Sequence, residues 1–448
     1  MLEFLAPVSI IIIVFSIITG NFLLPIGIIV ACVILFQIIK KPINGLIVLP
    51  FVSYLIPSTT NISMFSPGMV ISIITFCVAL VHIVYHKKIN KISNIWIVIF
   101  LMAINMSFVL ANSDGSWLLF LHLIQGIAPF ILFSLIVDNE SEARRVITFW
   151  LLAFSIFCFI HLGKAFFTDV QTQIVQLEVG NYVVQSGQST LVKLSSVRNR
   201  SLGGFNPNVL GWVGTLYLPL APILALGSKK KEKIIWWLVF FVIVFLMIFT
   251  LSRAAMLGMF LTFLLLLFYL KNKIGKQLIV IILPILISSI ALYFIWQMAS
   301  NEGAVGRSRT VSIDSILPAI KERWQIIVFA WEYIFSGQQT SARFSGGSHS
   351  GFTKAALEFG LSYFLLYCIP FIYMIIKSVK VSKFHFNPNI QLFTKGLLIA
   401  GIVATIQGIF GITLFSSLYA QVFWLFIGYL YVSSMEIEQA QRTNILSH

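Results

Sequence analysis

The chain has very little charge for its length. Only 10% of its 448 residues are charged, whereas 58% are hydrophobic and the mean hydropathy is +0.96. A soluble domain carries about 25% charged residues. The composition therefore excludes an ordinary soluble protein and predicts an all-α integral membrane protein, in which residues 1–448 form a single polytopic membrane domain.

Cysteine motifs and paired acidic residues are also missing. The four cysteines lie in apolar runs and form no CxxC pair: Cys32, Cys77, Cys158 and Cys368. We therefore expect no disulfide and no cysteine metal site. The aspartates are scattered, with no acidic pair at a helix mouth such as many metal-dependent sugar transferases use, so we expect no metal and no cofactor. No cleavage site follows the first apolar run, so we expect that run to remain as a helix.

Long apolar runs dominate what is present. A membrane-spanning helix needs about 20 apolar residues, and we expect 12–14 such helices. The first two spans are separated only by Gly20-Asn21, and the third is short and could be re-entrant. The predicted spans are 4–19, 22–39, 43–57, 67–85, 92–110, 118–137, 146–166, 207–227, 234–250, 253–270, 277–297, 352–376, 392–411 and 414–432.

The excess of basic residues predicts the orientation. The net charge is +15, and the basic clusters lie in short loops, which is the pattern of cytoplasmic loops and not of a nucleic-acid-binding protein. With a cytoplasmic N-terminus, clusters at 40–41, 87–91, 144–145, 229–233, 271–276 and 377–383 all fall inside. We expect a multi-pass protein of the cytoplasmic membrane with two long extracytoplasmic loops, 167–206 and 298–351. The second contains an amphipathic stretch, 315–335, which suits a helix at the membrane interface.

Three basic side chains fall at the predicted outer mouths of helices. Arg200 shortly precedes Asn206-Pro207, a favourable helix start whose free N–H groups attract anions. Arg253 opens the next outward-starting helix, where its charge opposes the helix dipole. Its partner is then either an external anion or an acidic residue of an outer loop. His349 lies in a Gly/Ser-rich turn before another helix; it is either a solvated loop residue or a group that moves a proton or holds phosphate.

These residues together predict a site for a multiply charged anion. An arginine binds phosphate oxygens in bidentate fashion and stays charged. Arg200 and Arg253 could therefore hold a diphosphate, such as that of a lipid-linked sugar, and stabilise it as it leaves. His349 would act beside them as the catalytic base or a phosphate ligand.

Other ionisable residues near this mouth have two interpretations. Lys354 and Glu358 are four residues apart on one helical face, so they either neutralise each other or leave Glu358 to act as a general base or to orient His349. The further outer basic residues either line a path for substrate or are solvated surface charges. They are Arg307, Arg309, Arg323 and Arg343.

The motifs resemble those of the O-antigen ligase and O-antigen polymerase superfamily of bacterial surface-polysaccharide enzymes. Three stretches carry the resemblance: RSLGGFNPNVLG at 200–211, SRAAMLG at 252–258, and the tract from Arg323 through His349 to Leu361. They occur in the family's order, with a large outer loop before the histidine. Ser350 stands where the family often has Asn, and Gln338-Gln339 follow Gly337 where a second Gly is common.

The resemblance implies a GT-C-like fold and a metal-independent, inverting glycosyltransferase. The donor would be a glycan on undecaprenyl diphosphate delivered by a flippase, and the acceptor a lipid-linked or cell-surface glycan. Arg200 and Arg253 would bind the diphosphate and His349 would act at the acceptor or the phosphate. A chain-length regulator is a further possible partner.

The motifs do not separate a polymerase from a ligase. The Ile-, Phe- and Lys-rich composition is typical of an AT-rich genome, as in many Gram-positive bacteria, which have no lipid A acceptor for a ligase. It therefore favours a polymerase, of exopolysaccharide, capsule or teichuronic-type polymer. An O-antigen polymer is also compatible with the motifs, and an O-antigen ligase is the alternative. A transporter of lipid-linked oligosaccharide is a further alternative, but it would carry charges along a central cavity, whereas the middles of the predicted helices are nearly free of charge. A non-catalytic scaffold or chain-length regulator is another, and it would show no activity of its own.

Overall fold

The computed structural model describes residues 23–55, 67–86, 94–111, 117–167, 207–249, 255–269, 328, 331–332, 351–410, 414, 416 and 417–446. Within these ranges the regular elements are α-helices and no strand occurs. The labelled helices are α2 (Leu23–Lys40), α3 (Ile43–Leu55), α4 (Pro67–His86), α5 (Asn94–Ala111), α6 (Trp117–Ile136), α7 (Glu140–Phe167), α10 (Pro207–Tyr217), α11 (Leu220–Gly227), α12 (Lys230–Phe249), α15 (Gly351–Phe384), α16 (Pro388–Phe410) and α17 (Ser417–Leu446). An unlabelled helix spans Ala255–Tyr269.

The protein is a multi-pass membrane protein. In the described part of the chain, six helices are long and apolar enough to cross a membrane: Gly68–Tyr85, Glu140–Ile160, Asn208–Gly227, Phe359–Phe384, Pro388–Ile409 and Leu418–Arg442. Twelve of the predicted spans coincide with helices of the structure. The spans predicted at 4–19 and 277–297 lie outside the described residues, as do nearly all of the two long loops.

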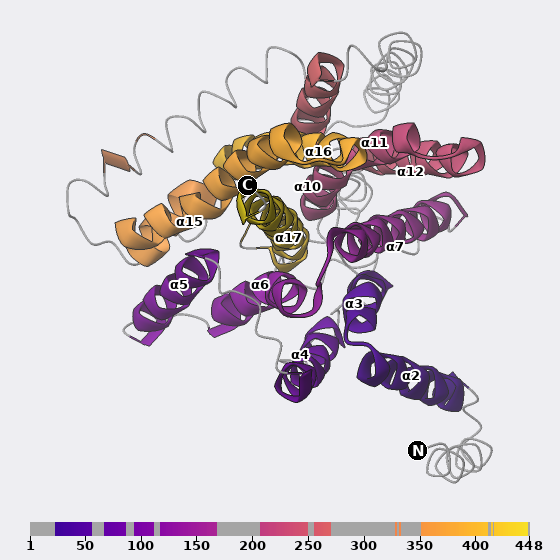
Figure 1. Ribbon diagram of the computed structural model, residues 1–448, viewed down its shortest axis with the longest axis horizontal. Helices are drawn as coiled ribbons and strands as arrows, with labels where there is room; N and C mark the ends of the chain where they lie inside the picture. Colours follow the sequence, from indigo (N-terminus) through magenta and orange to yellow (C-terminus); the bar gives the residue numbers. More distant parts are fainter. Residues whose placement is uncertain are drawn as a thin grey trace, which may run out of the picture.

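Helix α17 lies at the centre of the bundle. It contacts α6, α7, α10 and α15, and Figure 1 shows it (yellow) surrounded by them. Apart from Gln421, its sequence is apolar on every side from Leu418 to Val432, as expected of a buried helix. Small residues let α6 approach it closely: a Cβ on Gly126 would lie 2.6 Å from that of Ala420, and one on Gly428 would lie 3.0 Å from Phe133.

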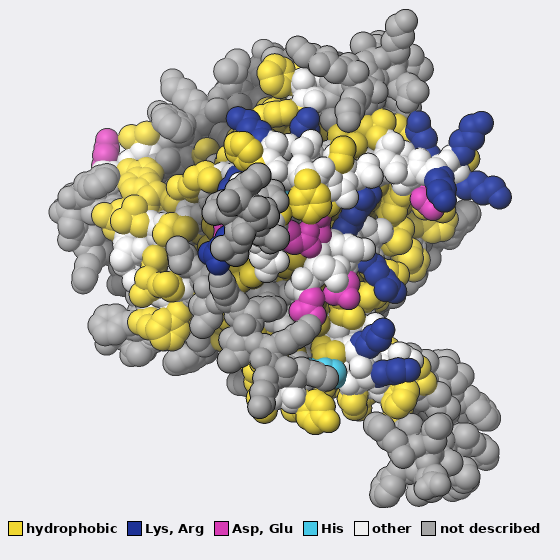
Figure 2. Space-filling view, in the orientation of Figure 1, with side chains coloured by type: hydrophobic (Ala, Val, Ile, Leu, Met, Phe, Trp, Pro, Cys, Tyr) yellow, Lys and Arg dark blue, Asp and Glu magenta, His cyan; other side chains and the backbone are white. Residues whose placement is uncertain are grey.

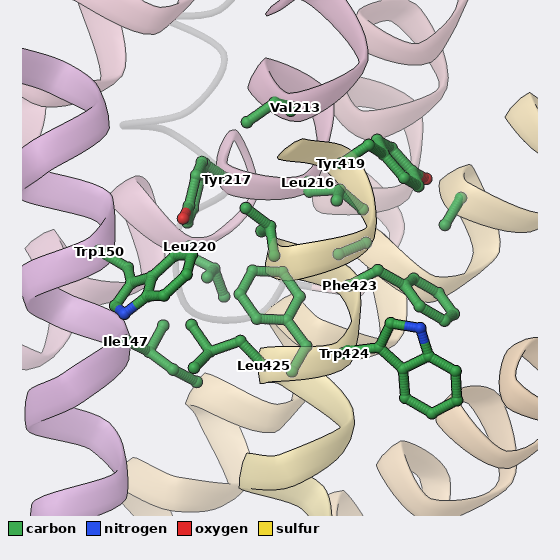
Figure 3. Close-up of a cluster of buried hydrophobic side chains, with 14 of the residues drawn as sticks. Ile147, Trp150, Val213, Leu216, Tyr217, Leu220, Tyr419, Phe423, Trp424 and Leu425 are labelled. Atoms are coloured by element: carbon green, nitrogen blue, oxygen red, sulfur yellow. The ribbon is translucent and has the colours of Figure 1, made fainter. Parts of the chain in front are cut away.

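Large buried aromatic residues fill the space between α17 and its neighbours (Figure 3). Three of their polar atoms are paired across helices. The Trp150 indole N–H donates to the Leu46 carbonyl oxygen at 2.8 Å, and the Tyr54 and Tyr217 hydroxyl oxygens lie 3.3 Å apart. Such pairing lowers the cost of burying these groups, so α3, α7 and α10 are tied together by specific contacts as well as by apolar packing.

Two predicted spans are interrupted in the structure. The span 207–227 is divided into α10 and α11 by a turn at 218–219, where Pro219 lacks the N–H that a continuous helix would use. Within α15, Gly360 has φ 84° and ψ 170°, which separates the first turns of the helix from the rest. This φ lies in the region that glycine adopts without steric cost.

Several basic residues lie on the face of the molecule that Figure 2 shows. Contacts place several helix ends together there. A Cβ on Gly227, at the end of α11, would lie 3.8 Å from the Arg144 guanidinium near the start of α7 and 3.9 Å from Asn389 at the start of α16. His385, which follows α15, lies 3.2 Å from Glu140, the first residue of α7. We call the end of the bundle that carries Arg144, Gly227, His385 and Asn389 the basic face. It joins loops that were predicted to share one side of the membrane.

Candidate functional site

The three motif-bearing segments lead into helices that meet at one point of α16. The decisive residues on α16 are Gln407 and Gly408, close to the end of α16 that lies away from the basic face. The first contact is with α10. The Thr215 hydroxyl oxygen lies 2.8 Å from Gln407 Oε1 and 2.6 Å from the Trp212 carbonyl oxygen. Both side chains are buried, so the contact fixes α10 against α16.

The Ala255–Tyr269 helix makes the second contact through Gly258. A Cβ at this position would lie 2.6 Å from Gln407 Nε2 and 2.7 Å from Thr215 Cγ2. These distances are shorter than real Cβ contacts, so only glycine fits without movement of its neighbours. Gly258 closes the SRAAMLG motif that begins with Ser252 and Arg253. The motif's last residue is therefore the one that lets this helix approach α10 and α16.

The first turn of α15 makes the third contact. A Cβ on Gly408 would lie 2.7 Å from the ring of Phe352, which follows His349 by three residues. The Phe352 ring also packs against Tyr367, with ring centroids 5.5 Å apart. An aromatic side chain thus anchors the start of α15 beside the position where α10 and the Ala255–Tyr269 helix meet.

The predicted site residues themselves are only partly described. Lys354 lies half-buried in the first turns of α15, and Glu358 belongs to the same helix, just before the break at Gly360. The side chain of Glu358 is outside the described set. The remaining predicted residues also lie outside the described part of the chain: Arg200, Arg253, Arg307, Arg309, Arg323, Arg343 and His349. The structure thus brings together the helices that these residues flank.

The starts of these three helices lie at the end of the bundle opposite the basic face. The α10–α11 segment ends at Gly227 and α15 ends next to His385, both on the basic face. Their first residues, Pro207 and Gly351, must therefore lie toward the opposite end. The Ala255–Tyr269 helix also begins there, because Gly258 in its first turn contacts Thr215 and Gln407. This geometry suits a site whose charged groups stand at the mouth of the bundle.

The sequence interpretation missed Gln407. A single glutamine in an apolar run is a recognisable signal, because an amide in a membrane helix is costly unless it is paired. The sequence does not identify Gln407 as part of a site, because nothing near it in the sequence shows that Thr215 and Gly258 are its neighbours. Tyr419 is a further polar residue of this end, with its side chain fully buried on α17.

A second polar cluster lies on the basic face. Glu140, His385 and Glu436 bring three potential ligand atoms within 4.8 Å of one another. That spacing is compatible with a metal ion, but the histidine is in an unsuitable state. The Asn387 backbone N–H donates to His385 Nδ1 at 3.1 Å, so the proton of a neutral imidazole is on Nε2. A metal-bound Nε2 instead requires the proton on Nδ1, so the donor set fits a proton better than a metal.

Comparison with known proteins adds no assignment. A scan against protein-family models and a search of characterised proteins find no match to this chain.

Proposed function

We propose that the protein is a glycosyltransferase that polymerises oligosaccharide repeats carried on undecaprenyl diphosphate, at the outer face of the cytoplasmic membrane. One observation carries the proposal: the helices that follow Arg200, Arg253 and His349 meet at Gln407-Gly408, with their first turns at the end opposite the basic face. Three sequence motifs that are far apart in the chain are thereby attached to one position in space. A GT-C-like arrangement is part of this proposal.

The proposed reaction is a single displacement. A hydroxyl of the acceptor glycan attacks the anomeric carbon of the donor, the bond from that carbon to the diphosphate oxygen breaks, and the configuration inverts. In this proposal His349 takes the hydroxyl proton and Glu358 orients His349. Arg200 and Arg253 stabilise the charge that develops on the departing undecaprenyl diphosphate, for which bidentate guanidinium groups are well suited. The residues proposed here supply the step without a metal ion.

The positions of the helix starts support an outer-face site. Lysine and arginine are enriched in cytoplasmic loops, so the basic face corresponds to the cytoplasmic side. The starts of α10, α15 and the Ala255–Tyr269 helix then point to the opposite side, where lipid-linked repeats arrive after they are flipped. The described residues of this membrane interior carry few charges, which fits an enzyme at the surface better than a transporter with a charged central cavity.

A genetic experiment tests the reaction class. In a strain that lacks this gene, a polymerase predicts single lipid-linked repeats and no long chains, and complementation should restore the chains. Long chains that remain on the carrier lipid would instead indicate a ligase. If single repeats accumulated only on the cytoplasmic side, the protein would instead be their transporter.

Substitution of Arg253 tests the site. Arg253→Ala should abolish polymer without lowering the amount of protein, and Arg253→Lys should restore little, because lysine lacks the bidentate fork. Arg145→Ala is the matched control, since Arg145 is exposed on α7 near the basic face. Normal polymer from Arg253→Ala would exclude the proposed role, whereas loss of polymer in Arg145→Ala would show that the assay reports charge and not the site.

A further inference from the structure

The cluster on the basic face joins three separate parts of the bundle. Glu140 is the first residue of α7, His385 lies in the turn between α15 and α16, and Glu436 lies on α17. His385 Nε2 is 3.2 Å from Glu140 Oε2 and 3.7 Å from Glu436 Oε2. The side chains of His385 and Glu140 are 0% and 5% exposed, and that of Glu436 is 25% exposed. Ionisable groups are rarely buried this far without a role or a partner.

The histidine is held neutral with its proton on Nε2. The Asn387 N–H occupies the lone pair of Nδ1, so protonation of Nδ1 would oppose two N–H groups. Burial, the largest influence on His385, also lowers its pKa. The negative charge of Glu436 acts in the opposite direction and is the weaker effect. The imidazole therefore turns one N–H toward two carboxylates, without hydrogen-bond geometry to either, and adds no positive charge.

The other oxygen of each carboxylate already has a partner. The Tyr429 hydroxyl donates to Glu140 Oε1 at 2.7 Å. The backbone N–H of Glu140 donates to Glu436 Oε1 at 2.8 Å, so Glu436 caps the positive end of α7 and is stabilised as an anion there. The Oε2 atoms both face Nε2, which has one proton to give. One more proton is needed to satisfy the pair.

The charge balance leads to the same requirement. The ionisable groups that face the cluster are Glu140 and Arg144 from α7, His385 from the turn, and Tyr429 and Glu436 from α17. Arg144 is the only cation among them in the described residues. The buried Glu140 and the partly exposed Glu436 stand beside one arginine and a neutral imidazole, which leaves one negative charge uncompensated, and like charges this close do not readily ionise together.

We propose that Glu140, Glu436 and His385 form a site that binds one proton, and that this proton holds the ends of α7, α15, α16 and α17 together on the basic face. The proton sits on Glu140 and is shared with Glu436 Oε2, while Nε2–H faces the same pair. Loss of the proton places two negative charges in one buried site and loosens the junction. The inference is independent of the reaction at the other end of the bundle.

The direction of the pH effect follows from linkage. The folded state holds a proton that an exposed glutamate in the unfolded chain releases near pH 4, so the folded state binds more protons at neutral pH. Stability contributed by the site is therefore present at low pH and is lost as pH rises through the ionisation of the shared proton. A metal site would show the opposite trend, because a metal ion competes with protons for its ligands.

The test compares unfolding temperatures of the purified full chain in lipid nanodiscs between about pH 5 and pH 9. The unfolding temperature of the wild type should fall by a few degrees as pH rises. Glu140→Gln, whose neutral amide replaces the protonated carboxyl, should flatten this dependence and exceed the wild type at high pH. Glu438→Gln is the matched control, because Glu438 is an exposed α17 residue that pairs with Lys380, and it should keep the wild-type slope.

A measurement that starts from the wild type guards against a misfolded mutant. Infrared difference spectra of the wild type should show the C=O stretch of a protonated carboxylic acid at neutral pH, and Glu140→Gln or Glu436→Gln should remove it. An equal pH slope in Glu140→Gln and the wild type would overturn the proposal, as would the absence of the protonated carboxyl band. An unfolding temperature that rises with added Zn²⁺ or Mn²⁺ and falls with chelator would overturn it in favour of a metal site.

Discussion

Gly258→Ala is the most direct test of the packing that positions the candidate site. The added Cβ would lie 2.6 Å from Gln407 Nε2 and 2.7 Å from Thr215 Cγ2. Thr215 is fully buried and Gln407 is 3% exposed, so neither side chain has open space to move into. Overpacking of this kind costs about 1–3 kcal/mol. The variant should unfold a few degrees below the wild type and should lose polymer if the mouth is displaced.

A control is needed because alanine is a better helix former than glycine by about 1 kcal/mol. Gly227→Ala provides it, since a Cβ there would meet its nearest atom at an ordinary 3.8 Å. The difference in unfolding free energy between the two variants should therefore be about 1–3 kcal/mol, free of the propensity term. Heating the detergent-solubilised proteins and measuring the monodisperse fraction that remains gives the comparison.

The double variant Gly258→Ala/Thr215→Ser sharpens the test. Serine lacks Cγ2, which removes one of the two close contacts, and it keeps the hydroxyl that lies near Gln407 Oε1. Stability should therefore recover in part, giving a coupling energy of about 0.5–3 kcal/mol. Purely additive effects, or a Gly258→Ala variant as stable as Gly227→Ala, would refute the arrangement of the Ala255–Tyr269 helix against α10 and α16.

Three further substitutions test other contacts by the same heating assay. Tyr54→Phe leaves the buried Tyr217 hydroxyl without its partner and should cost about 1–3 kcal/mol. The double variant Tyr54→Phe/Tyr217→Phe should cost less, and equal losses of stability would contradict the pairing. Gly360→Ala should destabilise by about 1–3 kcal/mol although no atom lies within 4 Å, because φ 84° with ψ 170° is a backbone region restricted to glycine, and an unchanged midpoint would contradict that geometry. Trp150→Phe should cost about 1–3 kcal/mol by leaving the Leu46 carbonyl unpaired, and an unchanged midpoint would count against that bond.

Hydropathy predicted where the helices lie but not where they end. The span predicted at 146–166 begins at Glu140 in the structure, because Asn139 accepts a hydrogen bond from the Glu142 N–H and starts the helix in a polar segment. The last span, predicted to end at 432, continues as α17 to Leu446, where Ile437 packs against Val381 and Ile390. Helix ends of this kind depend on capping and on contacts with other helices, which an apolar run does not report.

The candidate site could be predicted in part. The order of the motifs and the predicted orientation placed Arg200, Arg253 and His349 on one face. The structure shows only that the helices that follow them meet at Gln407-Gly408, and the positions and roles of these side chains remain predictions. The Glu140 cluster was not predicted at all. Its members are far apart in the sequence, and each one alone resembles an ordinary charge at a helix end.

The central position of α17 has a consequence for how the protein is assembled. Its neighbours α6, α7, α10 and α15 all precede it in the sequence, yet their inner faces are covered by α17. During synthesis these helices enter the membrane before the helix that fills the space between them. The bundle must therefore remain open, with Phe133 and Tyr217 unprotected, until α17 inserts. A chain that stalls before α17 would expose this interior to lipid and to quality-control proteases.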